Sequence, residues 1–139
     1  MLTPIIVAIL LHPQSSEVVT PKEGSPVRKA VLDALRAKTK SSLKGKKVLF
    51  KVDHMKQKGD WVFFKGKGQN PAGGDLDYHG TTFQEDIDNG AFDDWCCGLF
   101  HRVSGKWKVV EWSWGGTDVS YWGWWDKHHA PRDIFPPEN

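Results

Sequence analysis

A chain of 139 residues fits a single domain and is long enough to bury a core with ordinary two-layer packing. Hydrophobic residues at 39% and charged residues at 26% are the proportions of a soluble globular protein, which excludes fibrous and fully disordered chains. Eight tryptophans and seven phenylalanines against two tyrosines are an excess of large apolar rings. These rings must pack in the core or bind a partner.

The formal net charge of +2 hides an uneven distribution along the chain. The segment 38–67 holds ten lysines and only two acids, whereas 68–101 holds seven acids and no lysine or arginine. One interpretation is a basic patch for nucleic acid or another polyanion. The other is that the two segments lie close together and partly neutralise one another. The lysines are spaced singly rather than clustered, which favours the second interpretation and argues against nucleic acid.

The N-terminus contains an apolar run, Ile5–Leu11, that is too short to span a bilayer and ends at polar residues. This pattern resembles an export signal, although no Lys or Arg precedes the run and no Ala-x-Ala pattern follows it. The alternative is an apolar strand or arm. We assign residues 1–24 to an export signal and linker and residues 25–139 to one α+β domain. The expected location is secreted or periplasmic, with no membrane span in the mature chain.

The first predicted element is a helix. Ser25 is a good N-cap and Pro26 fits the first helical position. Apolar residues then recur at three-and-four spacing through about Lys38, which predicts one apolar face. The residues of that face are Val27, Ala30, Val31, Ala34 and Leu35.

Two strands are predicted next, over 47–55 and 61–66. In the first, apolar residues alternate with polar ones, as in a half-buried strand. The second is apolar on both faces at its start, which indicates a position inside the sheet. The short connection at Gly59-Asp60 makes the pair antiparallel.

The segment Gln69–Asp94 contains Gly, Pro, Asn and Asp throughout and has no sustained periodicity apart from a helical turn near 83–88. Long irregular connections are uncommon in compact domains unless they carry function or are disordered. This segment is therefore a candidate lid or partner-contacting element.

The clearest hairpin covers 95–114, with Ser104-Gly105 as a two-residue turn. An unbroken register pairs Val103 with Lys106 and sets Arg102 across from Trp107 as a cation–π pair. The same register puts these residues on one face: Trp95, Cys97, Leu99, Val110, Trp112 and Trp114.

Cys96 and Cys97 are the only cysteines. Neighbours in a strand point to opposite faces, so a structural disulfide between them is disfavoured. We expect two small side chains that fill gaps in the sheet, with a vicinal disulfide or redox pair as the alternative.

The tail is the remaining signal. Gly115-Gly116 breaks the strand, and Thr117 or Asp118 can cap a short helix through Val119 to Trp125. Flat aromatic rings bind sugars, peptides and bases through their faces. The alternative is that the tail closes over the sheet as core, but one short helix cannot point every ring inward. The predicted binding residues are Tyr121, Trp122, Trp124 and Trp125.

No motif marks a catalytic residue. The carboxylates and histidines available for acid–base work are Asp53, His54, His101, Glu111 and Asp118. Glu111 is the most interesting of these, and burial among its apolar neighbours would raise its pKa. His101 is expected opposite Lys108, at an exposed end of the hairpin. Asp86–Gly90 lacks a calcium-loop ligand where Ile87 stands, and His128-His129 lack metal-ligand spacing, so we predict no metal or cofactor.

Six short motifs together resemble a family of small, uncharacterised bacterial secreted proteins. They are Ser25-Pro-x-Arg-Lys, Gly59-Asp60-Trp61, Phe92-Asp93-Asp94, Gly105-Lys-Trp-Lys-Val-Val-Glu, Gly116-Thr-Asp-Val and Ala130-Pro131. The resemblance spans Ser25 to Phe135 and implies an exported α+β domain. It carries over no catalytic residue.

These patterns predict an α+β fold in which an N-terminal helix packs on an antiparallel sheet of about four strands, with a short C-terminal helix and a cystatin-like cone as one arrangement. The predicted function is a non-enzymatic secreted or envelope domain that binds a protein or glycan through the tail aromatics and the Gln69–Asp94 segment. The alternatives are a small enzyme with an acid–base carboxylate in a cone-shaped pocket and a polyanion-binding module.

Overall fold

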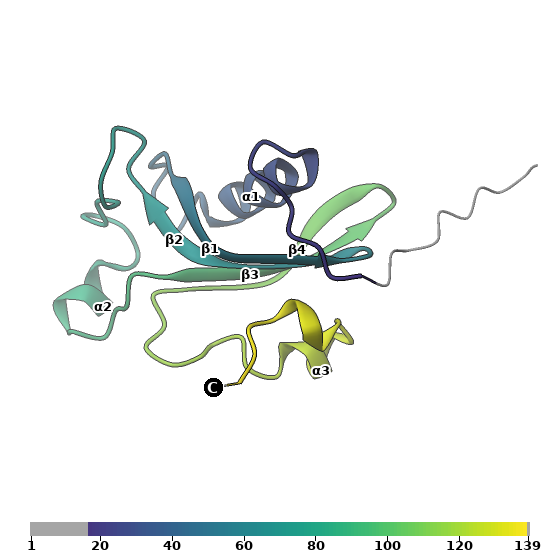
Figure 1. The fold of residues 1–139 in the computed structure, drawn as a ribbon. Helices are drawn as coiled ribbons and strands as arrows, with labels where there is room; N and C mark the ends of the chain where they lie inside the picture. Colours follow the sequence, from purple (N-terminus) through teal and green to yellow (C-terminus); the bar gives the residue numbers. More distant parts are fainter. Residues whose placement is uncertain (1–16, 139) are drawn as a thin grey trace, which may run out of the picture.

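A computed structural model describes residues 17–138, in which a four-stranded antiparallel sheet packs against an N-terminal helix (Figure 1). The elements in chain order are α1 (Pro26–Thr39), β1 (Leu49–Lys58), β2 (Trp61–Gln69), α2 (Gln84–Asp88), β3 (Cys96–Val103), β4 (Lys106–Trp114), α3 (Trp124–His128) and the 3₁₀ turn η1 (Arg132–Ile134). The predicted α+β class is confirmed, including the short C-terminal helix.

Helix α1 begins where the sequence predicts. The Ser25 hydroxyl accepts a hydrogen bond from the Arg28 amide at 3.3 Å, and Pro26 occupies the first turn. The apolar face of α1 lies over β4, and Val31 and Leu35 are fully buried. Burial of each such side chain contributes about 1.5–3 kcal/mol. Helix α1 therefore closes one face of the sheet.

The strands form a meander in the order β1-β2-β3-β4. Strand β2 lies inside the sheet, as predicted, and both Phe63 and Phe64 are fully buried on its two faces. Near the turn between β3 and β4, the Arg102 guanidinium lies 5.0 Å from the Trp107 ring centre, which confirms the predicted cation–π pair.

The two faces of the sheet are covered by different parts of the chain (Figure 1). On the helix face, α1 and the segment 70–94 enclose a core that includes Phe64 and Phe100. On the opposite side, which we call the tail face, the C-terminal segment 117–138 packs on Phe63 and Leu99. In Figure 1, α1 lies above the sheet and α3 below it.

A β-bulge at Val110 changes the predicted register of the β3–β4 hairpin. The pairs near the turn are as predicted, down to Phe100 opposite Val109. Leu99 then pairs with Glu111, so Val110 is an extra residue in β4. Every later side chain of β4 is thereby moved to the other face.

The prediction that Trp112 and Trp114 share a face with Cys97 and Leu99 is therefore wrong. Both tryptophans pack on the helix face, whereas Cys97 and Leu99 belong to the tail face. The bulge also sends Glu111 to the tail face, where it contacts α3. Glu111 thus lies outside the space between α1 and the sheet, where the predicted cone-shaped pocket would be.

A second bulge, at Asp53, has a similar effect in β1. Val52 pairs with Gly66 and His54 pairs with Lys65, so Asp53 is the extra residue. His54 consequently turns to the tail face, and the following Met55 is buried on the helix face.

The segment 70–94 is a folded part of the domain rather than an open lid. Its side chains Leu76, Tyr78 and Phe83 are buried in the helix-face core. The Tyr78 hydroxyl donates a hydrogen bond to Asp94 at 2.5 Å and accepts one from the Trp114 indole at 3.0 Å. The predicted helical turn is present as α2.

The start of the domain lies earlier than residue 25. Val19 pairs with Gln57 through two backbone hydrogen bonds, Pro21 is buried, and the Lys56 ammonium donates to the Thr20 hydroxyl. Residues 19–21 therefore belong to the domain and not to a free linker.

The predicted export signal in residues 1–16 lies outside the described residues. No helix within 17–138 is both long enough and apolar enough to cross a membrane.

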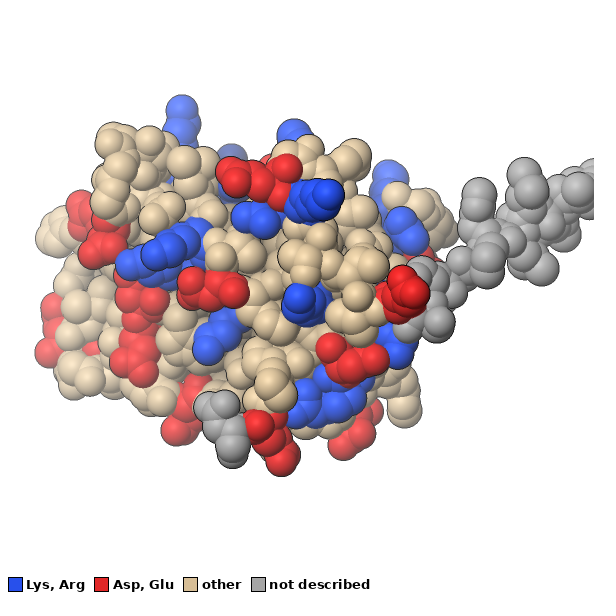
Figure 2. All heavy atoms as spheres, viewed as in Figure 1, with Lys and Arg blue, Asp and Glu red and all other residues tan. Residues whose placement is uncertain are grey.

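The lysine-rich and acidic segments meet in the fold. Lys67 pairs with Asp75 at 3.0 Å and Lys46 approaches Asp77 at 3.7 Å. Figure 2 shows positive and negative side chains interspersed over the face in view. Neighbouring charges of opposite sign weaken a single-sign field, which supports mutual neutralisation over a basic patch.

Candidate binding site

The secondary structure of the tail segment differs from the one the sequence predicts. The predicted helix from Val119 is wrong, because α3 begins only at Trp124. Gly123 precedes it with φ 82°, a left-handed conformation that interrupts a helix. The preceding residues form turns, and the Trp122 amide donates to the Val119 carbonyl at 3.1 Å.

Two of the four predicted binding residues are buried. Tyr121 is 7% exposed and Trp124 is 5% exposed, and both pack on Phe63 with ring centres 5.0 and 6.4 Å away. The expectation that Trp124 presents its ring to a partner is wrong, because α3 directs this side chain onto the sheet. Both residues hold the tail on the tail face.

The other two predicted residues form an exposed aromatic step. Trp122 is 51% exposed and meets the half-buried Trp125 edge to face, with ring centres 4.9 Å apart. Trp125 in turn lies against the buried Phe135 at 5.2 Å. The expectation of at least one exposed ring is confirmed, and that ring is supported by a chain of aromatic contacts reaching the core.

Arg132 completes the step. Its guanidinium lies 4.0 Å from the Trp125 ring centre and 5.5 Å from that of Trp122, which is cation–π distance in both cases. Its Nη1 also donates to the Pro136 carbonyl at 3.1 Å. Sequence reasoning missed this residue, since a single arginine after a proline carries no motif. We call Trp122, Trp125 and Arg132 the aromatic step.

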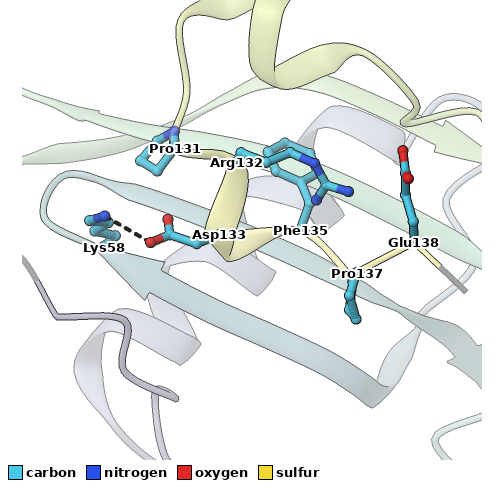
Figure 3. A pocket seen from close by; sticks show the side chains of 7 residues that line it. All are labelled: Lys58, Pro131, Arg132, Asp133, Phe135, Pro137 and Glu138. Carbon is cyan, nitrogen blue, oxygen red and sulfur yellow. Dashed lines mark hydrogen bonds and ion pairs between the residues drawn. The ribbon is translucent and has the colours of Figure 1, made fainter.

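An open hollow of about 820 Å³ lies beside the aromatic step, with Arg132 belonging to both (Figure 3). Lys58 and Asp133 form an ion pair of 2.8 Å at one end, and Glu138 lies toward the other. The lining residues are Lys58, Pro131, Arg132, Asp133, Phe135, Pro137 and Glu138. The volume lies within the range of about 300–1,000 Å³ typical of small-molecule sites.

His54 fixes the turn that carries Arg132. A carbonyl oxygen can only accept, so Nε2 carries a proton and donates it to the Ile134 carbonyl at 2.7 Å. Burial lowers the pKa of His54 below its ordinary value of 6.5, and the charges of Lys56 and Lys65 add to this, against the opposing effect of the hydrogen bond. His54 is thus a structural contact of η1 rather than an acid–base group open to a ligand.

Glu111 fixes α3 in a comparable way. Its Oε1 accepts hydrogen bonds from His128 Nε2 at 2.6 Å and Lys127 Nζ at 2.9 Å. Partial burial raises the pKa of Glu111, but these two contacts outweigh it and the net pKa is lowered. Burial alone would raise this pKa, as expected, but the two charged partners reverse the direction, and a carboxylate held charged in this way is poorly suited to act as a general acid.

The remaining candidates for chemistry are not brought together. Asp53 and Asp118 are exposed on separate segments, and His101 stacks on Trp61 with ring centres 3.9 Å apart, opposite Lys108 as predicted. Cys96 and Cys97 are buried free thiols on opposite faces of the sheet. Burial raises the pKa of Cys97 to about 12, so this thiol is protonated and unreactive. Among residues 17–138 no three potential ligands are grouped to hold a metal ion.

No protein-family model, curated protein or solved structure matches this chain. The resemblance to small bacterial secreted proteins therefore stays a prediction, and a function must be argued from the geometry of the tail.

Proposed function

We propose that this protein is a non-enzymatic domain that binds a glycan through the aromatic step and the adjoining hollow. The observation that carries the proposal is the exposed ring of Trp122, supported from behind by Trp125 and flanked by Arg132. Covering a large exposed apolar ring with a ligand removes apolar surface from water, which favours binding. Trp and Arg are also among the residues enriched at the energetic centres of protein–protein interfaces.

The contacts beneath Trp122 favour binding because they already hold the side chains of the site in place before a ligand arrives. The ring contacts Trp125, which rests on Phe135 in the tail-face core. Arg132 is held by its contact with the Trp125 ring and by the Pro136 carbonyl. Side chains that are already ordered lose less conformational entropy when a ligand arrives.

The charges in the hollow favour a hydroxyl-rich ligand over a polyanion. Lys58 and Arg132 supply donors, and Asp133 and Glu138 supply acceptors, within one hollow. A sugar hydroxyl both donates and accepts hydrogen bonds, so the hydroxyls of a glycan can bond to both kinds of group. For a polyanion, the attraction of the two cations would be opposed by the repulsion of the two carboxylates.

A glycan array tests the proposal when it is read with three proteins side by side. Wild type is expected to bind a set of glycans that Trp122→Ala loses. The matched control is Trp107→Ala, because Trp107 also lies beneath an arginine but on strand β4 and on the helix face of the sheet. This control should bind as wild type does.

Two results would count against the proposal. If wild type binds no glycan, or if Trp122→Ala binds as well as wild type, glycan recognition at the aromatic step is wrong. Capture of a protein from an envelope extract that depends on Trp122, without any glycan binding, would assign the step to a protein partner instead.

The proposal includes export of the chain to a secreted or periplasmic location. It is supported by the apolar run Ile5–Leu11 in the sequence. N-terminal sequencing of the protein recovered from its native host is expected to show a new terminus near Ser15 or Ser16. Recovery of the cytoplasmic protein alone, beginning at Met1 or Leu2, would contradict export and leave the binding proposal untouched.

A further inference from the structure

A second hollow lies on the other side of the molecule, between the C-terminal half of α1 and the start of β1. Its volume is about 460 Å³. The walls and floor are formed by aliphatic side chains, of which Leu43 and Val48 are buried. The apolar lining residues are Ala37, Leu43, Val48, Leu49 and Pro71. We call this hollow the α1–β1 groove.

Leu49 stands at the groove with 48% of its surface exposed. The exposed Ala37 and Pro71 line the same groove. A single exposed aliphatic residue is ordinary in a soluble protein, but exposed aliphatics that share one concave surface mark a place where an apolar ligand fits.

Cations surround this apolar surface. The side chains of Arg36, Lys40, Lys46 and Lys47 line the groove, and no carboxylate does so among residues 17–138. Arg36 is already engaged, since Nε donates to the Val48 carbonyl and Nη1 pairs with Asp33, each at 2.8 Å. Lys46 donates to the Asp77 carbonyl at 2.8 Å.

Lys40 and Lys47 differ from these two. Both are exposed, and neither forms an ion pair with any residue in the described part of the chain. An apolar trough thus carries two uncompensated positive charges at its edge. A ligand that complements it has a hydrocarbon body and a single anionic end.

We propose that the α1–β1 groove binds a fatty acid, with the alkyl chain along Leu43, Val48 and Leu49 and the carboxylate between Lys40 and Lys47. The volume suits a small molecule rather than a folded partner. Burial of each methylene of the chain contributes about 0.8 kcal/mol. The exposed lysines orient the ligand and add a smaller, salt-dependent term.

The test uses decanoate as the probe, kept below the concentration at which it forms micelles, with backbone amide chemical shifts as the readout. Decanoate should shift the amides of Ala37 and Leu49 in a saturable way, whereas acetate should shift neither. The neutral 1-decanol should bind the same residues about fivefold more weakly, since it lacks the contact with the lysines.

Variants separate the groove from general surface charge. The double variant Lys40→Gln/Lys47→Gln should weaken decanoate binding about fivefold and leave 1-decanol binding unchanged. Lys22→Gln/Lys106→Gln is the matched control, since neither lysine lines the groove, and it should bind decanoate as wild type does. All of these lysines are exposed, so the fold is expected to persist in both variants.

Three outcomes would overturn the proposal. They are no saturable decanoate binding by wild type, equal loss of binding in the two lysine variants, and binding to anionic lipid vesicles without binding of monomeric decanoate. The last result would assign the lysines to a membrane surface instead of a free acid. None of these outcomes bears on Trp122, which lies on the opposite side of the sheet.

Discussion

The two faces of the sheet are closed by different kinds of structure. On the helix face, the continuous apolar side of α1 packs on the sheet, and the segment 70–94 adds Leu76, Tyr78 and Phe83. On the tail face the segment 117–138 contains only the five-residue α3 and the short η1. Its position depends on individual contacts, including those of His54 and Glu111.

This difference bears on where binding sites can arise. A regular amphipathic helix turns most of its apolar residues toward the sheet, so few large rings remain outside. An irregular segment cannot direct every ring inward, and the tail leaves Trp122 in solvent while burying Tyr121 and Trp124. The tail face therefore presents the larger exposed aromatic surface, at the cost of dependence on polar contacts.

The largest expected effect comes from two adjacent core residues. Phe63→Ala and Phe64→Ala each remove a fully buried ring and should cost about 3–5 kcal/mol of the free energy of unfolding. Amide hydrogen exchange should distinguish them. Phe63→Ala should speed exchange in 121–135 first, whereas Phe64→Ala should speed it in α1. Identical exchange patterns would mean that the two coverings do not behave as separate units.

A smaller effect is expected from the contact between Glu111 and α3. Glu111→Gln keeps the shape of the side chain but removes its charge, so the hydrogen bonds from His128 and Lys127 weaken. Because these groups are partly exposed, the loss in urea unfolding should be about 1 kcal/mol. The exposed Glu85→Gln on α2 is the control and should change stability by less than about 0.5 kcal/mol. Equal effects would show that Glu111 does not hold the tail.

Acid should loosen the tail face in two stages. The pKa of His54 is lower in the folded state than in the unfolded state, where it is about 6.5. Below pH 6.5 the unfolded state therefore binds more protons, and the free energy of unfolding should decrease as pH falls. The lowered pKa of Glu111 adds a second loss as pH falls below 4.5. His54→Gln should remove the first stage of the pH profile of unfolding, and the exposed His79→Gln should retain it. A profile that is flat from 6.5 to 4.5 in wild type would refute the role of His54.

The smallest expected effect is that of Trp122→Ala on stability. Half of this residue is in solvent and its contacts are with the tail residues Trp125 and Arg132, so the free energy of unfolding should fall by no more than about 1 kcal/mol. Thermal unfolding of the variant beside wild type measures this. A loss comparable to that of Phe63→Ala would make Trp122 a core residue and remove the main support for a binding site.

The elements with local signals were predictable from the sequence. Ser25-Pro26 defines the start of α1, and Ser104-Gly105 defines a turn from which the pairing of Arg102 with Trp107 follows. The bulges at Asp53 and Val110 were not predictable, because a one-residue shift is decided by packing on both faces and leaves no local pattern.

The candidate site was predictable only in part. The run of rings indicated that some of them would be exposed, but the left-handed Gly123 and the second layer beneath the sheet decide which ones. One short helix cannot turn Trp122, Trp124 and Trp125 all inward, so the sequence predicts exposed rings without showing that Trp124 is the buried one. Arg132 was missed because its proximity to Trp122 and Trp125 arises from tertiary structure alone.

The most direct test of the binding account is the affinity of one glycan, selected on the array, for wild type, Trp122→Ala and Trp107→Ala, measured by calorimetry under the same conditions. The account predicts that Trp122→Ala weakens binding about tenfold or more, while Trp107→Ala stays within about twofold of wild type. Equal dissociation constants for wild type and Trp122→Ala would contradict it.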